Sequence, residues 1–204
     1  WDFNDNDITV DVGAGAASLL GTTGSFSSGA GSSDPLPTAD QAWSSTGYPA
    51  QGTGDKTEGV QFMLSTVGYD SIMLSFDNRQ SNTASKYLQV QYTVDGSSFM
   101  DAPAGLFAAA GGSVWNNGNA VDLSAIAGAA NNANFGVRIV TTFEPSTSAY
   151  ATAASGGTYG TSGTVRYDMV SFTGNVISVV PEPGSLALLL AGLATVGFVS
   201  RRRA

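Results

Sequence analysis

The sequence predicts an all-β fold, an antiparallel β-sandwich, followed by a single transmembrane helix at the C-terminus. Short segments alternate apolar and polar residues, which is the period of a half-buried strand. Only 12% of the 204 residues are charged and 26 are glycine, a composition typical of sandwiches with long polar loops. An uncharged segment of sixteen residues lies near the C-terminus. We therefore expect a β domain over residues 1–178 and a tail over residues 179–204.

The alternation locates the expected strands. They are residues 8–12, 60–64, 72–76, 88–94, 135–139 and 165–169, with another strand beginning at Phe99. Asp95 and Gly96 have the sequence of a tight hairpin turn, and residues 121–130 that of one short helical turn. Long stretches rich in Gly, Ser and Thr separate the strands, and we expect further strands inside them. These stretches are residues 13–33, 34–59 and 146–163.

Charge and residue types exclude several functions. The chain has eight basic and sixteen acidic residues, of which the tail holds three basic ones (Arg201, Arg202 and Arg203) and one acidic one (Glu182). Residues 1–178 therefore have five basic and fifteen acidic residues and a net charge of −10. Such a domain repels phosphate backbones, which excludes nucleic acid as a partner. Its acidic surface serves either solubility or the binding of divalent cations. The chain has no cysteine or histidine, which excludes Cys-His and Ser-His-Asp catalysis and zinc sites built on these residues.

The C-terminal segment is predicted to span a membrane. Residues 185–200 are uncharged and would span about 24 Å as a helix at 1.5 Å per residue, close to the roughly 30 Å of a bilayer core. Arg201, Arg202 and Arg203 follow at once and are expected to stay in the cytoplasm, which places the β domain outside. A buried core helix is the alternative, but it would carry polar residues at helical spacing.

A proline motif precedes this segment. Pro181 and Pro183 bracket Glu182, which favours an extended stretch at the membrane surface. The motif, the apolar segment and the arginine cluster, in this order over residues 180–204, resemble the PEP-CTERM sorting signal. The resemblance implies recognition and cleavage by an exosortase, a membrane-embedded transpeptidase-like protease. A plain single-span anchor is the alternative.

Export follows from the same resemblance. The precursor is expected to be anchored in the inner membrane of a Gram-negative-type bacterium, and the processed protein to reach the cell surface or the exopolysaccharide matrix. Because the chain begins at Trp1 rather than at a methionine, we expect that a leader has been removed.

Part of the β domain resembles a known class of sandwich. Residues 87–99, a strand followed by Thr-Val-Asp-Gly-Ser-Ser-Phe, look like a segment of galactose-binding-like and discoidin-like jelly rolls. Residues 135–139 and 163–170 resemble the later strands of these domains. The resemblance covers roughly residues 59–174 and implies a jelly roll.

The N-terminus is a candidate calcium site. Five side chains among residues 2–7 carry oxygen, and Ca²⁺ takes six to eight oxygen ligands. Jelly rolls of the resembled class often bind calcium between the first and last strands, which implies that Asp2, Asp5 or Asp7 joins Asp168. Asp168 lies mid-strand, where aspartate is disfavoured, so it needs a partner. The alternatives for Asp168 are pairing with Arg138, pairing with Arg166, and exposure to solvent.

Aromatic residues in polar stretches are candidates for binding a glycan, because sugar rings stack on aromatic faces while amides supply hydrogen bonds. The candidate residues are Trp43, Tyr48, Trp115 and Asn117. The alternative is that the two tryptophans close the ends of the sandwich. Two functions therefore stay open, a sorted surface or biofilm-matrix protein and a calcium-supported carbohydrate-binding module.

A hydrolase is the third and weakest possibility. Glycosidases need two carboxylates about 5–10 Å apart, and nothing in the sequence pairs Glu58 with Glu144 or with an aspartate. We therefore expect that the protein is not an enzyme.

Overall fold

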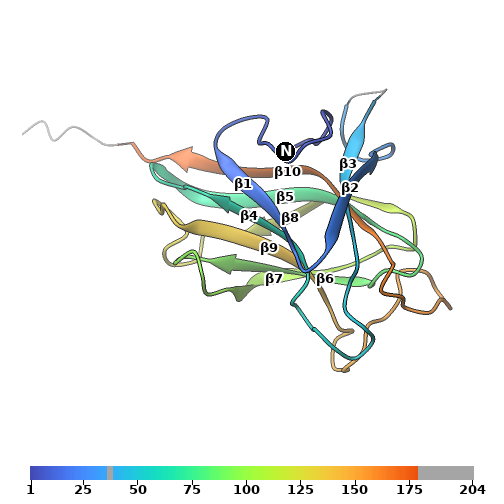
Figure 1. Cartoon of the computed structure of the whole chain (residues 1–204). Coiled ribbons are helices and arrows are strands. Elements are labelled where there is room, and N and C mark those ends of the chain that lie inside the picture. Colours follow the sequence, from blue (N-terminus) through green and yellow to red (C-terminus); the bar gives the residue numbers. More distant parts are fainter. Residues whose placement is uncertain (36–38, 179–204) are drawn as a thin grey trace, which may run out of the picture.

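The chain folds as a two-sheet antiparallel β-sandwich, as the sequence predicts. The computed structural model describes residues 1–35 and 39–178, in which ten strands form two five-stranded sheets, drawn in Figure 1. No helix long and apolar enough to cross a membrane occurs in these residues. The predicted membrane span and the rest of the tail lie outside them.

Each sheet combines strands from both halves of the sequence. The first sheet has the order β1 (Gly15–Leu20), β4 (Gly59–Leu64), β9 (Phe135–Thr142), β6 (Tyr87–Thr93) and β7 (Met100–Ala108). The second sheet has the order β2 (Thr23–Ser28), β3 (Gln41–Thr46), β10 (Val165–Val176), β5 (Tyr69–Gln80) and β8 (Trp115–Asp122). All neighbouring strands are antiparallel. Consecutive strands alternate between the sheets several times, so most pairings are long-range.

The core lies between the sheets and explains the alternating pattern. Phe62 of β4, Leu88 of β6 and Leu74 of β5 have no exposed surface, while their neighbours in sequence point outward. Burying side chains of this size stabilises the fold by about 1.5–3 kcal/mol each. The same alternation therefore determines which residues of each strand reach the outer faces.

Most predicted strands are found, and one local prediction is wrong. Residues 8–12 form no strand, because side chains of the N-terminal loop bind its own backbone. Thr9 N donates to Asp7 Oδ1 (2.6 Å) and Asp2 N to Asp11 Oδ2 (2.8 Å), which competes with sheet pairing. In residues 121–130, β8 continues to Asp122 and hydrogen-bonded turns follow, in which Ile126 N donates to Leu123 O (3.1 Å) and Ala129 N to Ile126 O (3.1 Å).

Three strands fall inside the long polar stretches, as expected, and one strand was not predicted. β1, β2 and β3 lie within residues 13–59. The unpredicted strand is β8, whose sequence of Trp, Asn and Gly lacks apolar alternation. It is an edge strand paired with β5 only, where polar residues meet solvent.

The N-terminal residue completes the second sheet. β3 pairs with β10 only as far as Tyr167, and beyond it Trp1 lies beside β10. The Trp1 amino group donates to Val170 O (2.8 Å), and Val170 N donates to Trp1 O (2.9 Å). This exchange holds the acidic N-terminal segment next to the middle of β10.

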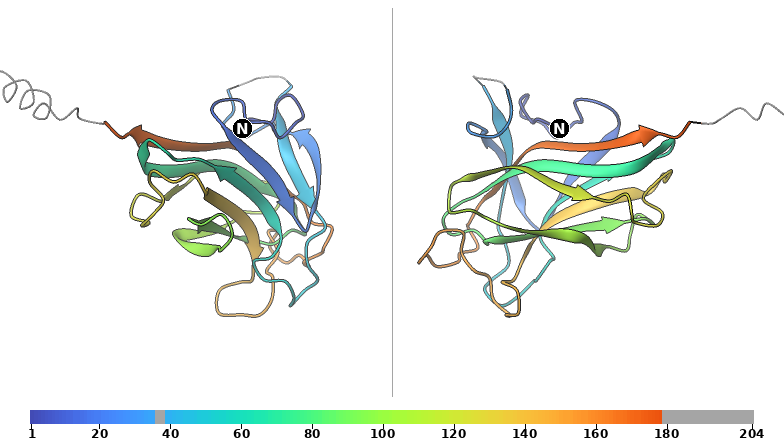
Figure 2. Two further views of the ribbon diagram at one scale, coloured as in Figure 1. Left: turned by 60° about the vertical axis from the view of Figure 1, so that its left-hand side comes forward. Right: turned by 180° about the vertical axis from the view of Figure 1, so that it is seen from behind.

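The end of β10 and the β2–β3 pair lie at opposite ends of the sandwich, as the views in Figures 1 and 2 agree. The last residue of β10 is Val176. The chain therefore leaves the domain toward the tail far from the start of β10, where the candidate site is built.

Candidate functional site

Three aspartates meet on the outer side of the second sheet. They are Asp34 in the loop after β2, Asp40 directly before β3, and Asp168 in β10, and one carboxylate oxygen from each lies within 4.8 Å of the others. Asp168 has no exposed surface and Asp40 is 8% exposed. Like charges so close are costly to bury, so the arrangement needs a positive partner or a proton.

Two oxygens of this cluster lack partners. Asp40 Oδ1 and Asp168 Oδ2 are buried and accept no hydrogen bond from the described residues, whereas Asp168 Oδ1 accepts one from Met169 N (2.8 Å). Burial, followed by the nearby charges of Asp40 and Asp34, raises the pKa of Asp168 to about 7 even though Met169 N donates to Asp168 Oδ1. Burial and the charge of Asp34 also raise the pKa of Asp40.

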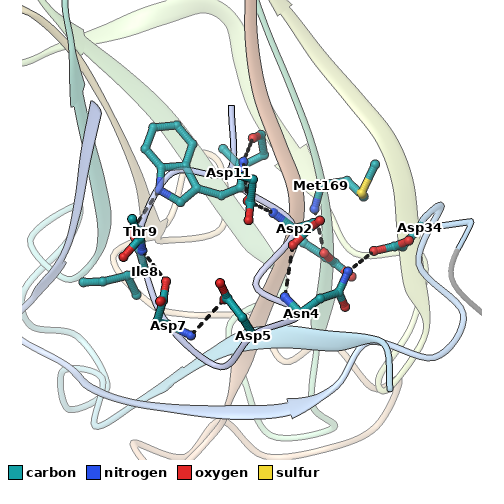
Figure 3. A network of polar contacts seen from close by, with 12 residues as sticks. Asp2, Asn4, Asp5, Asp7, Ile8, Thr9, Asp11, Asp34 and Met169 are labelled. Atoms are coloured by element: carbon teal, nitrogen blue, oxygen red, sulfur yellow. Dashed lines mark hydrogen bonds and ion pairs between the residues drawn. The ribbon is translucent and has the colours of Figure 1, made fainter. Parts of the chain in front are cut away.

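The N-terminal loop fixes one side of the cluster. Asn4 Nδ2 donates to Asp34 Oδ2 (2.8 Å) and Gln41 N donates to Asn4 Oδ1 (2.9 Å), so one amide ties Asp34 to the start of β3. Figure 3 shows Asn4 turned toward Asp34, while Asp5 and Asp7 lie along their own loop. Asn4 is therefore a positioning residue for the cluster.

The loop over residues 28–34 covers the cluster and is held from β8 and β5. Trp115 Nε1 donates to Ala30 O (3.0 Å) and Asn117 Nδ2 to Gly31 O (3.0 Å). Ser33 N donates to Asp77 Oδ2 (2.5 Å). These bonds keep Asp34 above β10.

The structure assembles a different set of aspartates from the predicted one. Asp168 is in the cluster, and the charge of Asp2 is close enough to raise the pKa of Asp40. Asp5 and Asp7 are exposed and outside the cluster, and each accepts a hydrogen bond from its own loop. Asp34 and Asp40 were missed because isolated aspartates in a polar stretch give no sign of which strand they approach.

The structure does not show any of the three other environments considered for Asp168, which were pairing with Arg138, pairing with Arg166 and exposure to solvent. Arg138 lies in the first sheet and donates from Nε to Gln61 Oε1 (2.7 Å), and Arg166 Nη1 donates to Ser28 O (2.8 Å). Neither arginine forms a salt bridge with Asp168 among the described residues, and Asp168 has no surface exposed to solvent.

The residues proposed to bind sugar separate into two groups. Trp43 and Tyr48 are each 3% exposed and belong to the core, where Trp43 packs against Phe3 and Phe62. A sugar cannot reach these two side chains, so the prediction that they bind a glycan is wrong. Trp115 and Asn117 lie at the surface of β8 and hold the loop over residues 28–34.

The donor set fits a hard divalent cation. All three side chains offer carboxylate oxygen, the ligand that Ca²⁺ and Mg²⁺ prefer. A cation placed among them would satisfy Asp40 Oδ1 and Asp168 Oδ2 together. The residues that would hold it are Asp34, Asp40 and Asp168.

Comparison with known protein families gives a match for the tail. Residues 179–203 match the PEP-CTERM protein-sorting motif. No curated protein matches the chain.

The fold is similar to solved carbohydrate-binding modules. One is the CBM22-1–CBM22-2 tandem domain of Xyn10C from Paenibacillus barcinonensis, with a TM-score of 0.53 and 12% identity over 85% of this chain and 48% of that chain. This chain thus spans about half of the tandem structure. Another is the CBM22-2 xylan-binding domain of Xyn10C, with a TM-score of 0.52 and 11% identity over 85% of this chain and 97% of that chain. At these identities the similarity shows the fold alone.

Proposed function

We propose that this chain is an exported protein that an exosortase sorts to the bacterial surface or exopolysaccharide matrix, where its jelly-roll domain binds carbohydrate. The match of residues 179–203 to the PEP-CTERM motif carries the sorting part. Pro181, Glu182 and Pro183 form the recognition motif, and Arg201, Arg202 and Arg203 the cytoplasmic end of the precursor's anchor. The attachment of the tail at the end of β10 leaves the opposite end of the domain free to meet a ligand.

Sorting is tested by the mass of the protein extracted from the cell surface. We expect a mass that lacks Arg201, Arg202 and Arg203, and a Glu182→Ala variant that stays at precursor mass. A surface protein that retains all three arginines would instead establish a plain single-span anchor.

Carbohydrate binding is supported by fold analogy and by the site. The similar structures are carbohydrate-binding modules, and the outer face of the second sheet presents Trp115 at its edge. The test is saturable binding of the full chain, in detergent, to the exopolysaccharide of its host. No saturable binding, with or without calcium, would leave sorting as the whole proposal.

We further propose that Ca²⁺ supports the domain at Asp34, Asp40 and Asp168. Asp40 and Asp168 each have a buried carboxylate oxygen without a hydrogen-bond partner among the described residues. A bound cation would account for these oxygens, whereas an acidic surface that serves solubility would leave its carboxylates in water. Bound Ca²⁺ would supply positive charge that joins the loop over residues 28–34 to β10.

The proposal does not include catalysis. The clustered carboxylate oxygens lie within 4.8 Å, less than the separation of about 5–9.5 Å that glycosidases use, and two of the three residues are buried. A hydrolase remains the competing hypothesis, and release of reducing ends from host polysaccharide would establish it.

A further inference from the structure

Two arginines lie side by side on the outer face of the second sheet. In the antiparallel pairing of β10 with β5, Arg166 stands directly opposite Arg79. Their neighbours Val165, Tyr167 and Gln80 are buried, so both arginines point away from the core. Side chains opposite each other in a ladder have Cβ atoms about 4.5–5.5 Å apart, and like charges there are destabilising. Such a pair needs an anion or a compensating carboxylate.

The described residues form no salt bridge with either arginine. The two salt bridges found there join the amino terminus to Asp11 and Lys56 to Asp101, and neither involves Arg79 or Arg166. Asp77, two residues before Arg79, accepts hydrogen bonds from Ser33 N and Gly118 N. The other nearby acid, Asp168, belongs to the acidic cluster.

Both guanidinium groups have N–H donors that make no hydrogen bond within the described residues. Arg79 Nε donates to Ser113 O (2.9 Å) and Arg166 Nη1 to Ser28 O (2.8 Å). Arg166 Nε is buried and meets no acceptor among the described residues. Each guanidinium has five N–H donors, and since Arg79 Nε and one Arg166 Nη1 donor are bonded and Arg166 Nε is buried, the donors left for a ligand are on the Nη atoms.

The arginines belong to a polar row that crosses the whole sheet. The register places these residues opposite one another, strand by strand: Ser25, Ser44, Arg166, Arg79 and Trp115. Strands lie about 4.8 Å apart, so Trp115 is about 10 Å from Arg166 along the row. Its indole N–H is bound to Ala30 O, which fixes the ring. An aromatic ring opposite Arg79, with Arg166 on the next strand, combines stacking with anion recognition.

We propose that this row binds an acidic sugar, with a uronate carboxylate held by Arg79 and Arg166 and a sugar ring stacked on Trp115. Guanidinium groups match carboxylates in a bidentate geometry, and aromatic faces pack against the C–H faces of sugars. This inference rests on the proposed carbohydrate-binding function and names its ligand class. Because residues 1–178 carry a net charge of −10, an anionic glycan has to be recognised locally, at these paired cations.

The row also adjoins the candidate calcium site. The loop that holds Asp34 contacts the row at two points, through Ser28 O on Arg166 and Ala30 O on Trp115. A cation at the acidic cluster would therefore order the loop that borders the row, and binding is best measured in calcium.

The test is calorimetric titration of the full chain in detergent with uronate oligosaccharides of the gluco, manno and galacto series, each beside its carboxyl-reduced, neutral form. We expect at least one uronate to bind about tenfold or more tightly than its reduced form, about 1.4 kcal/mol. Arg79→Gln and Arg166→Gln should each abolish that preference. Arg138→Gln is the matched control, because Arg138 lies in the first sheet, and it should keep the preference.

The outcomes separate this inference from the function on which it rests. Equal binding of charged and reduced sugars, or a preference that survives both glutamine variants, would refute the acidic-sugar site while carbohydrate binding stands. If no sugar binds, carbohydrate binding fails, and the acidic-sugar site fails with it. Titration with inorganic sulfate then tests the pair for anion binding: shifts of the Arg79 and Arg166 guanidinium Nη–H resonances would reveal an anion site for another ligand. Preference for sulfated over carboxylated sugars would reassign the charged group to a sulfate ester.

Discussion

Asp40 and Asp168 come together at Gly29, where Asp40 Oδ1 and Asp168 Oδ2 are both buried and accept no hydrogen bond from the described residues. The two aspartates are 128 positions apart in the sequence and meet because β3 and β10 are neighbours in the second sheet. From this contact we expect the stability of the domain to depend on calcium, on pH and on the size of residue 29.

Calcium is expected to raise the melting temperature. A ligand at 100 times its dissociation constant stabilises a fold by about 2.7 kcal/mol, which corresponds to about 5–10 °C for a domain of this size. Asp168→Asn should abolish the calcium response measured by thermal unfolding with calcium or a chelator. Asp5→Asn is the matched control, since Asp5 lies outside the cluster. Loss of the response in Asp5→Asn, but not in Asp168→Asn, would move the site to the N-terminal loop.

Without calcium, the free energy of unfolding should fall as pH rises from about 4 to about 7. The folded state holds the Asp168 proton up to a pKa of about 7, whereas the unfolded state loses it near 3.9. The folded state thus binds more protons in this window, so stability decreases with pH. Denaturant unfolding between pH 4 and 8 measures the slope. Asp168→Asn should remove this contribution, and an identical slope in the variant would contradict the assignment.

Protons and calcium should compete at the same oxygens. Calcium affinity is expected to be weaker at pH 5.5 than at pH 8, because Asp168 must lose its proton to bind the cation. Calcium titrations followed by calorimetry at the two pH values provide the measurement. Equal affinity at both would show that Asp168 is not a ligand.

Gly29→Ala should destabilise the domain and weaken calcium binding. A Cβ at Gly29 would overlap Asp40 Oδ1 and come within 2.8 Å of Asp168 Oδ2, so the cluster would have to open. Overpacking of this kind typically costs about 1–3 kcal/mol. Gly111→Ala is the control, because its Cβ would meet only Val114 Cγ2 at an ordinary 3.6 Å. Chemical unfolding of both variants compares them, and equal stability would argue against close packing at Gly29.

Trp43 and Tyr48 should affect stability rather than binding. Trp43→Ala removes a core ring and is expected to cost about 3–5 kcal/mol. Tyr48→Phe breaks the buried hydrogen bond between Tyr48 OH and Ser45 Oγ (2.5 Å) and should cost about 1–3 kcal/mol. Folded Tyr48→Phe should bind glycans as well as the parent protein. A selective loss of glycan binding at unchanged stability would restore the prediction that Tyr48 binds a glycan.

The sequence alone predicted much of this protein. Alternation between apolar and polar residues at 60–64, 88–94 and 135–139 is a local property, so it identified β4, β6 and β9 and the antiparallel sandwich. The order of proline motif, apolar segment and arginines identified the sorting motif, because such a signal is a linear stretch of chain. Asp168 stood out because an aspartate in the middle of a strand needs a partner.

The tertiary structure alone decided what these residues meet. Asp34 and Asp40 join Asp168, and Arg79 stands beside Arg166, because strands distant in sequence become neighbours in the second sheet, and no local pattern encodes that register. Trp43 and Tyr48 were predicted to bind a ligand, but both are buried in the core. The sequence could not show this, because an aromatic residue in a polar stretch gives the same local pattern whether its side chain faces the core or the solvent. Local periodicity thus identified several of the strands, while their long-range pairing decided which carboxylate, guanidinium and aromatic side chains come together.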